Sequence, residues 1–414
     1  MDYIEQLGAG AKAAEPAVSA MGTREKNSVL GAISAALRSH VTEIIGANQV
    51  DIDAARKNGM SEAMIDRLTL TEARINGMAD GVDKVISLPD PIGGVIGGGD
   101  LPNGLHVIKK RVPIGTIGII FESRPNVTVD AAALCFKAGN TVILRGGSDA
   151  INSNKALVGL MRRVLRDSGC NENAVQLVED TSRDVANAMM KLNQYIDLLI
   201  PRGGGGLIRA VVQNATVPVI QTGEGNCHVY VDESADISMA VEIINNAKTQ
   251  RPSVCNAIEG IIVHEKAAPE LFRKLAERWQ GRVAVRGDEA TSKLIEVEKI
   301  ADDADYATEF LDYRLSAKIV KNIDEAIEHI SRFGTKHSEC IVTQSLHSAE
   351  LFQQRVDAAA VYVNASTRFT DGFEFGLGAE IGISTQKLHA RGPMGLEALT
   401  TYKYLINGNG QIRS

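Results

Sequence analysis

The chain has 414 residues, of which 44 % are hydrophobic and 23 % are charged, and these are ordinary values for a globular protein. At about 100–200 residues per domain, this length predicts two or three domains, with enough buried surface to need no disulfide or metal. The net charge is −7, from 44 basic and 51 acidic residues, which argues against nucleic acid as the main partner because phosphate-binding proteins usually carry a basic surface.

The sequence lacks the marks of a membrane or secreted protein. No apolar run reaches the ~18–20 residues that a membrane span needs, and the acidic stretch 1–5 is unlike a signal peptide. The cysteines are widely spaced and form no CxxC pair, so we expect neither a disulfide framework nor a cysteine-rich zinc site. A reduced, cytoplasmic protein is therefore expected. The cysteines are Cys135, Cys170, Cys227, Cys255 and Cys340.

Residues 1–90 are expected to be helical, because apolar residues recur at intervals of three and four. Thr23 and Ser61 are candidate N-caps of these helices. Residues 92–111 then predict a β-hairpin, since a Gly-rich run leads into an Asn-Gly turn dipeptide. A hairpin of this size is too small to be a domain, so we expect it to pair with another subunit or to cover a sheet edge.

From residue 112 the pattern changes to short apolar strands with helices between most of them, which is typical of a parallel, doubly wound α/β sheet. The expected strands are 114–121, 141–144, 175–178, 196–200 and 217–220. The expected helices are 128–138, 150–168, 182–192 and 205–214.

A second series of the same kind begins after about residue 228 and predicts a second α/β domain. Its expected strands are 228–232, 259–264, 316–320, 340–343 and 360–363. Its expected helices are 236–249, 267–279, 288–297 and 322–333. The stretch 399–405 is a further strand candidate, in a tail that packs elsewhere.

Cys255 is the leading candidate for a nucleophile. Polar and turn-forming residues precede it and an expected strand follows, so it lies in a loop at a strand edge, where reactive side chains are usually presented. Cys135 and Cys340 lie inside apolar segments and are expected to be small core residues. Because most cysteines are packing residues, it is the loop that distinguishes Cys255.

Three expected strand-to-helix turns carry polar or Gly-rich loops, which is where open α/β sheets bind ligands. Asn126 can donate its amide to a developing oxyanion, or can simply cap its helix. Arg145 and Ser148 can hold a phosphate or a ribose, and the loop 202–206 repeats this arrangement. Two such loops favour a dinucleotide, although neither is G-x-G-x-x-G and ordinary βα turns look the same.

Nothing in the sequence predicts a metal site. His228, His264 and His389 show no metal-ligand spacing, so each is expected to be structural. The acidic cluster 302–305 is expected to be a solvated loop.

Six stretches of the chain form long, specific motifs. They are 112–115, 121–126, 221–228, 250–256, 361–368 and 391–396. Together they resemble the aldehyde dehydrogenase superfamily and, within it, the branch that reduces an acyl phosphate of glutamate. The resemblance spans nearly the whole chain. It implies an α/β fold with a cofactor-binding parallel domain, an α/β catalytic domain and a small oligomerisation hairpin and tail.

The resemblance implies a role for each candidate residue. Cys255 falls at the position of the nucleophile, and Asn126, with the Cys255 backbone N–H, at the oxyanion hole. An Arg at position 145, where the superfamily usually carries Lys, is compatible with a 2′-phosphate and so with NADP. The implied NADPH-binding residues are Arg145, Ser148, Gly203, Gly204, Gly205 and Glu309. The implied substrate-binding residues are Arg124, Ser366, Thr367 and Arg368, and which Arg takes a carboxylate or a phosphate stays open.

The resemblance also implies a domain organisation and partners. Residues 1–91 and 112–228 are expected to form the NADP-binding domain and 229–398 the catalytic domain, with 92–111 and 399–414 as oligomerisation elements. A homo-oligomer is therefore expected, with glutamyl 5-phosphate as the substrate and no nucleic-acid or membrane partner. Association with glutamate 5-kinase, which makes this unstable acyl phosphate, is a hypothesis.

One departure from the superfamily bears on the reaction. Hydrolytic members carry a general-base Glu shortly before a Gly-Gly-Lys; here Thr222 aligns with that Glu, and Glu224 is two residues away. Thiolate attack on an acyl phosphate expels phosphate and gives a Cys255 thioester without any base for water. Reduction with NADPH then yields glutamate 5-semialdehyde, a step of proline biosynthesis. A CoA-dependent acyl-reducing enzyme and a non-catalytic homologue remain as alternatives.

Overall fold

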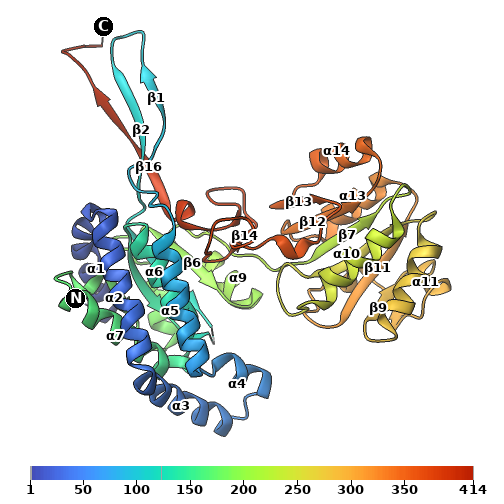
Figure 1. Ribbon diagram of the computed structural model, residues 1–414, viewed down its shortest axis with the longest axis horizontal. Helices are drawn as coiled ribbons and strands as arrows, with labels where there is room; N and C mark the ends of the chain where they lie inside the picture. The colour runs from blue at the N-terminus through green and yellow to red at the C-terminus, as the bar shows by residue number, and fades with distance from the viewer. Residues whose placement is uncertain (1, 123, 414) are drawn as a thin grey trace. The chain divides into compact units, whose positions relative to one another are not determined.

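The computed structural model of the chain describes residues 2–122 and 124–413 (Figure 1). The chain divides into two compact units, each of which is described here by itself. The first comprises Met1–Gln221, Gly376–Gly382 and Met394–Ser414, and the second comprises Thr222–Phe375 and Ile383–Pro393. The expected α/β class is confirmed, because each unit contains a parallel sheet covered by helices. No helix in the described part of the chain is long and apolar enough to cross a membrane.

The N-terminal region is helical, as expected. Its helices are α1 Tyr3–Ala20, α2 Thr23–Ser39, α3 Val41–Lys57, α4 Glu62–Leu68 and α5 Glu72–Ser87. The buried face of α2 includes Leu30, Ile33 and Leu37, and this helix packs against both α5 and α7. Ser61 is the N-cap of α4, as predicted. The prediction for Thr23 was wrong: it is the first residue of α2, and the cap is Gly22, whose N–H donates to the Glu25 carboxylate (2.7 Å).

The first unit holds a four-stranded parallel sheet in the order β5-β4-β3-β6. Its strands are β3 Thr116–Phe121, β4 Thr141–Arg145, β5 Val175–Leu177 and β6 Leu198–Arg202. The connecting helices are α6 Pro125–Lys137, α7 Ile151–Asp167, α8 Arg183–Met189 and α9 Gly205–Asn214, with short 3₁₀ turns η1 Ser148–Ala150 and η2 Glu172–Ala174. The strand order reverses between β3 and β6, and open α/β sheets bind ligands at the carboxyl ends of the strands at such a point.

The expected strand 217–220 is wrong. This segment makes only a single parallel bridge, between Val219 and Leu199. Pro218 accepts a hydrogen bond from the Leu199 N–H, but it has no N–H of its own to donate, so a longer ladder cannot form.

A separate antiparallel sheet in the first unit has the order β1-β2-β16. Its strands are β1 Val95–Asp100, β2 His106–Pro113 and β16 Thr400–Asn407, which confirms both the hairpin and the C-terminal strand. In Figure 1 this sheet extends away from the helices of its own unit. Tyr402, Tyr404 and Ile406 are exposed along β16, at the open edge of the sheet.

The second unit is built on a seven-stranded parallel sheet in the order β10-β9-β11-β8-β7-β12-β13. Its strands are β7 Cys227–Val231, β8 Ile258–His264, β9 Ala284–Gly287, β10 Lys299–Ile300, β11 Arg314–Val320, β12 Ser338–Val342 and β13 Ala360–Val363. The helices are α10 Ile237–Thr249, α11 Ala268–Trp279, α12 Asp303–Tyr306, α13 Ile323–Phe333 and α14 Leu346–Arg355. The short antiparallel pair β14 Ile383–Ser384 and β15 Gly392–Pro393 completes the unit.

Two predictions fail in the second unit, and two short strands were missed. The expected helix 288–297 is only the 3₁₀ turn η3 Thr291–Lys293, and strands β9 and β10 flank it. These strands are four and two residues long, too short to give a period-two pattern. The acidic cluster 302–305 is no solvated loop, because Asp305 is 3 % exposed and is paired with Arg286 and Lys299.

Asp51, on α3, joins the N-terminal helices to the first sheet. Its buried carboxylate accepts hydrogen bonds from the N–H groups of Asn152 (3.1 Å) and Ser153 (2.8 Å), in the first turn of α7. It also accepts from the Ser153 hydroxyl (2.6 Å). Nearby, Ile52 and Ala150 share one apolar cluster. A buried acid therefore satisfies the otherwise unpaired donors at the start of α7.

We expect Asp51→Ala to lower the free energy of unfolding by about 2 kcal/mol, because it leaves buried helix N–H groups without an acceptor. Urea unfolding followed by far-ultraviolet circular dichroism measures this loss. The control is Asp53→Ala, on the exposed face of the same helix, which should change stability by less than about 0.5 kcal/mol. Equal effects of the two substitutions would contradict the capping role.

Candidate active site

The predicted site residues form two groups, one in each unit. In the first unit they lie at the carboxyl ends of β3, β4 and β6. In the second unit they lie in the segments that lead into β8 and β11, at the amino edge of that sheet, and in the turn after β13. Each group is built below from its own contacts.

The turn after β6 is held by a carboxylate from the turn after β3. Glu122 accepts a hydrogen bond from the Gly204 N–H (2.9 Å), and α9 begins at the next residue, Gly205. A Cβ on Gly203 would lie 2.5 Å from the Glu122 carboxylate, so a larger residue there would displace this side chain. Gly203–Gly205 lie at the reversal of strand order and at the start of a helix, where open α/β sheets bind anionic ligands.

Asn126 lies in the first turn of α6 and is exposed. Its side-chain amide donates to the carboxylate of Asp130, one turn later (3.0 Å). Burial raises the pKa of Asp130 to about 6, against the opposing effects of Asn126 and Arg202. Asp130 therefore fixes the orientation of the Asn126 amide. Arg124 is the N-cap residue of the same helix, and Ser123 lies outside the described residues.

Arg145 ends β4 and is half-buried. Its guanidinium donates to the Thr181 carbonyl (2.9 Å), while its Nε is buried without a hydrogen-bond partner in the described structure. Burial lowers the pKa of Arg145, and the charges of Asp180 and Glu122 oppose this shift. Ser148 is exposed at the start of η1, three residues further on. An incompletely paired cation beside an exposed hydroxyl at a strand end fits the phosphate-bearing end of a nucleotide.

Cys255 is partly exposed in the loop that leads into β8. Its carbonyl oxygen accepts a hydrogen bond from the thiol of Cys227, the first residue of β7 (3.2 Å). Burial raises the pKa of the Cys227 thiol, so this group stays a neutral donor. A Cβ on Gly225 would overlap the Cys255 carbonyl, at 1.5 Å from its oxygen. Two residues at the start of β7 thus fix the main chain of Cys255.

The turn after β13 is tied to the same loop. The Asn256 amide donates to the carbonyls of Arg368 (3.3 Å) and Thr370 (2.9 Å), and the buried Thr367 hydroxyl donates to the Asn256 carbonyl (2.7 Å). The Arg368 guanidinium is half-buried; burial and then Arg251 lower its pKa, while Cys255 raises it.

Two further contacts complete this turn. Arg368 Nε donates to the side chain of Gln250 (2.8 Å), and the buried Ser366 hydroxyl accepts from the Arg368 N–H (3.3 Å). The structure thereby brings three of the predicted substrate-binding residues next to the predicted nucleophile. A guanidinium beside a thiol fits an anionic acyl substrate.

Glu309 lies on the other side of Gly225. Its carboxylate accepts a hydrogen bond from the Gly225 N–H (2.7 Å). Burial raises the pKa of Glu309, and the charge of Glu224 raises it further. The main chain of Gly225 is therefore held between Glu309 and the Cys255 carbonyl, which joins a predicted cofactor residue to the predicted nucleophile.

Position 222, which aligns with the base of hydrolytic enzymes, is 3 % exposed. Thr222 forms an antiparallel bridge with Ser384 of β14, and the next N–H, that of Gly223, donates to the Ile383 carbonyl (3.2 Å). The main chain at Thr222 and Gly223 is thus held against β14, and position 222 carries no carboxylate.

Sequence reasoning missed Asp130, Cys227 and Gly225. Asp130 stands four residues after Asn126 on one helix face, and this spacing was a usable signal. Cys227 and Gly225 lie about 30 residues from Cys255 in the sequence and contact its main-chain carbonyl, so no local pattern could find them.

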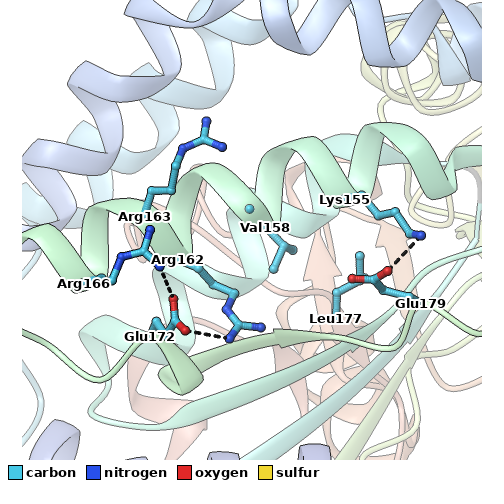
Figure 2. Close-up of a pocket in the computed structure, with 9 residues that line it drawn as sticks. Lys155, Val158, Arg162, Arg163, Arg166, Glu172, Leu177 and Glu179 are labelled. Atoms are coloured by element: carbon cyan, nitrogen blue, oxygen red, sulfur yellow. Dashed lines mark hydrogen bonds and ion pairs between the residues drawn. The ribbon is translucent and has the colours of Figure 1, made fainter.

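A separate cavity of about 240 Å³ lies on the surface of α7 in the first unit (Figure 2). Lys155, Arg162 and Arg166 line it, together with Glu172 and Glu179. Figure 2 shows Lys155 paired with Glu179, while Arg162 and Arg166 share Glu172. Arg163 also lines the cavity, so its cations outnumber its carboxylates. It contains none of the predicted site residues. Within residues 2–122 and 124–413, no three His, Cys, Asp or Glu side chains gather as a metal site.

Comparison with known proteins places the chain in a family. The family model described as "Aldehyde dehydrogenase family" matches residues 2–294. Gamma-glutamyl phosphate reductases from Clostridium botulinum (strain Alaska E43 / Type E3) and Carboxydothermus hydrogenoformans are 58 % and 56 % identical to it, over 100 % of both sequences in each pair.

Solved structures agree with this placement. The crystal structure of the gamma-glutamyl phosphate reductase from Thermotoga maritima is 49 % identical, covers 100 % of both chains and matches with a TM-score of 0.98. An acetylating aldehyde dehydrogenase from Geobacillus thermoglucosidasius, 18 % identical over 99 % of this chain and 97 % of its own, shares the fold alone, with a TM-score of 0.71. The chain therefore belongs to the aldehyde dehydrogenase family of oxidoreductases, within which its full-length relatives are gamma-glutamyl phosphate reductases.

Proposed function

We propose that the protein reduces L-glutamyl 5-phosphate to L-glutamate 5-semialdehyde and phosphate with NADPH, as a step of proline biosynthesis. The observation that carries this proposal is the full-length identity of 58 % to a protein named gamma-glutamyl phosphate reductase. It is supported by the Thr222 segment, which offers no carboxylate where a hydrolytic enzyme keeps its base.

Cys255 is the proposed nucleophile. Its thiolate attacks the acyl carbon, the C–O bond to phosphate breaks, and phosphate leaves with the bonding electrons, which gives a thioester on Cys255. Asn126 and the Cys255 N–H are proposed to donate to the oxyanion of the tetrahedral intermediate. Asp130 would keep the Asn126 amide in place for this purpose. The close contact of Gly225 with the Cys255 carbonyl supports a fixed loop.

The proposed cofactor is NADPH. Arg145 and Ser148 would take the adenosine ribose and its 2′-phosphate, Gly203–Gly205 the pyrophosphate, and Glu309 the ribose of the nicotinamide. NADPH supplies the hydride that reduces the thioester. The Cys255 sulfur then departs as a thiolate and the aldehyde is released. The incomplete pairing of Arg145 supports its part in this assignment.

The proposed substrate contacts follow from charge. Arg124 and Arg368 would bind the carboxylate and the phosphate, because guanidinium groups match both anions with paired donors. Ser366 and Thr367 would shape the turn that receives the amino-acid end of the substrate. The hydrogen bonds between this turn and the Asn256 carbonyl and amide support the assignment.

The sheet β1-β2-β16 is the proposed contact between subunits of a homo-oligomer. Its outer strand leaves a hydrogen-bonding edge uncovered and exposes Tyr402, Tyr404 and Ile406. Such an edge is suited to pairing with another chain. Glutamate 5-kinase is a further proposed partner, since direct transfer would protect an unstable acyl phosphate.

The decisive test follows NADP⁺ reduction in the reverse direction, with glutamate 5-semialdehyde and with or without inorganic phosphate. We expect NADPH to form only when phosphate is present, because phosphate must release the acyl group from Cys255. An equal rate without phosphate would identify a hydrolytic enzyme, with Glu224 as its base. A rate that requires CoA in place of phosphate would favour a CoA-dependent relative.

Cys255→Ser should lower kcat/KM at least about 10³-fold, because a serine hydroxyl without a neighbouring base is a far weaker nucleophile. NADPH affinity, measured by the fluorescence of the bound nucleotide, should stay within about twofold of the parent protein. Cys170→Ser, at a partly buried position after α7, is the matched control and should keep full activity. Retention of activity within tenfold in Cys255→Ser would refute the assignment of the nucleophile.

Arg145→Ala should reduce kcat/KM for NADPH about 10–100-fold, since it removes the guanidinium proposed to face the 2′-phosphate. The value for NADH, which lacks that phosphate, should change by less than about threefold. Steady-state kinetics with both nucleotides measure the ratio. If both values fall together, Arg145 supports the fold of the loop and does not select the cofactor.

A further inference from the structure

A fully buried ion pair lies beneath the loops that carry Cys255 and Glu309. Lys248, on α10, and Glu259, on β8, are both 0 % exposed, and their charged atoms are 2.6 Å apart. The Lys248 ammonium also donates to the Ile258 carbonyl (3.0 Å). Burying two charges is costly, and apolar side chains of the same size often stabilise a core as well or better. The pair therefore calls for an explanation beyond stability.

The second carboxylate oxygen of Glu259 makes a contact outside the pair. It accepts a hydrogen bond from the N–H of Leu311 (3.2 Å), in the segment that leads into β11. Leu311 has a positive φ of 55°, in the left-handed region that is unfavourable for residues other than glycine. Its N–H needs a fixed acceptor for this turn to persist, and Lys248 keeps the Glu259 carboxylate in place to provide one.

The turn at Leu311 carries Glu309 two residues earlier. The intervening Phe310 lies beneath the Arg286 guanidinium, with 5.2 Å from the guanidinium carbon to the ring centre. Glu309 itself reaches the Gly225 N–H. The segment is thus anchored at three successive residues, and the Glu259 contact is the one that fixes the unfavourable backbone conformation.

We propose that Lys248 and Glu259 are positioning residues, which hold the 309–311 turn so that the Glu309 carboxylate is aimed at the ribose hydroxyls of the bound nucleotide. This inference rests on the proposed function, in which Glu309 binds that ribose. The alternative is that the pair only fills the core between α10 and β8.

Two double variants separate these alternatives, because neither leaves an unpaired buried charge. Lys248→Met with Glu259→Gln keeps a side-chain oxygen that can accept from the Leu311 N–H, whereas Lys248→Met with Glu259→Leu has none. NADPH affinity is measured by nucleotide fluorescence, and backbone order by hydrogen exchange of the peptide that spans Glu309–Leu311. Thermal unfolding and circular dichroism verify that both proteins fold.

We expect the Gln variant to bind NADPH within about threefold of the parent protein and the Leu variant about tenfold more weakly. The Leu variant should also exchange its 309–311 amides at least about tenfold faster, and its KM for NADPH should rise with kcat nearly unchanged. In a Glu309→Ala background, the Leu substitution should add no further loss of affinity. Equal exchange rates and affinities in the two double variants would overturn the positioning role.

The same experiment distinguishes a failure of the proposed function. If Glu309→Ala leaves NADPH affinity unchanged, the assignment of Glu309 to the ribose is wrong, and so is the aim that we infer for the turn. Hydrogen exchange still decides whether Glu259 orders the turn. If Glu309→Ala weakens binding and the two double variants do not differ, the assignment of Glu309 stands and the positioning proposal falls.

Discussion

The loop that carries Cys255 depends on one close contact, between the main chain of Gly225 and the Cys255 carbonyl. No side chain fits at position 225, because a Cβ there would overlap the Cys255 carbonyl. The Gly225 N–H donates to Glu309. Two residues further on, the thiol of Cys227 donates to the same Cys255 carbonyl. Because main-chain atoms make this contact, the loop cannot shift without moving the start of β7. In the proposed reaction, this contact holds the Cys255 thiol in position before the substrate binds.

The candidate residues lie at the carboxyl edge of the sheet in the first unit and mainly at the amino edge of the sheet in the second unit. In the first unit, helices begin where β3, β4 and β6 end, so unpaired N–H groups and partial positive charge collect at that carboxyl edge, which suits a phosphate-bearing cofactor. In the second unit, the segments before β7, β8 and β11 meet at the amino edge, where loops rather than helix starts supply the contacts. Loops can place a thiol, a carboxylate and a guanidinium close together without the bias of a helix dipole.

The sequence could predict the elements whose residue pattern is local. It could not predict contacts between segments that are far apart in the chain. The apolar residues of 114–121 and 196–200 predicted the strands that the structure shows as β3 and β6, because strands buried on both faces need apolar residues along most of their length. The two-residue strand β10 has no such pattern, and Pro218 broke one that was present. Cys255 could be identified from its loop, but the clamp by Asn256, Thr367 and Gly225 could not, since it joins segments that are separated by 30 residues or more. Lys248 is the residue whose place the sequence predicts least well. A lysine on a helix is expected to face solvent, but this one is fully buried.

Position 222 differs from that of hydrolytic relatives in more than the identity of one side chain, because its main chain is also held in place. The main chain of Thr222 bridges Ser384 and the Gly223 N–H donates to the Ile383 carbonyl, so this turn is held against β14 and the Thr222 side chain is enclosed. Glu224, two residues further on, is close enough to raise the pKa of Glu309, whose carboxylate accepts the Gly225 N–H. In the proposed reaction the acyl group is already activated by its phosphate, so the thiolate can displace the leaving group without a base that activates water.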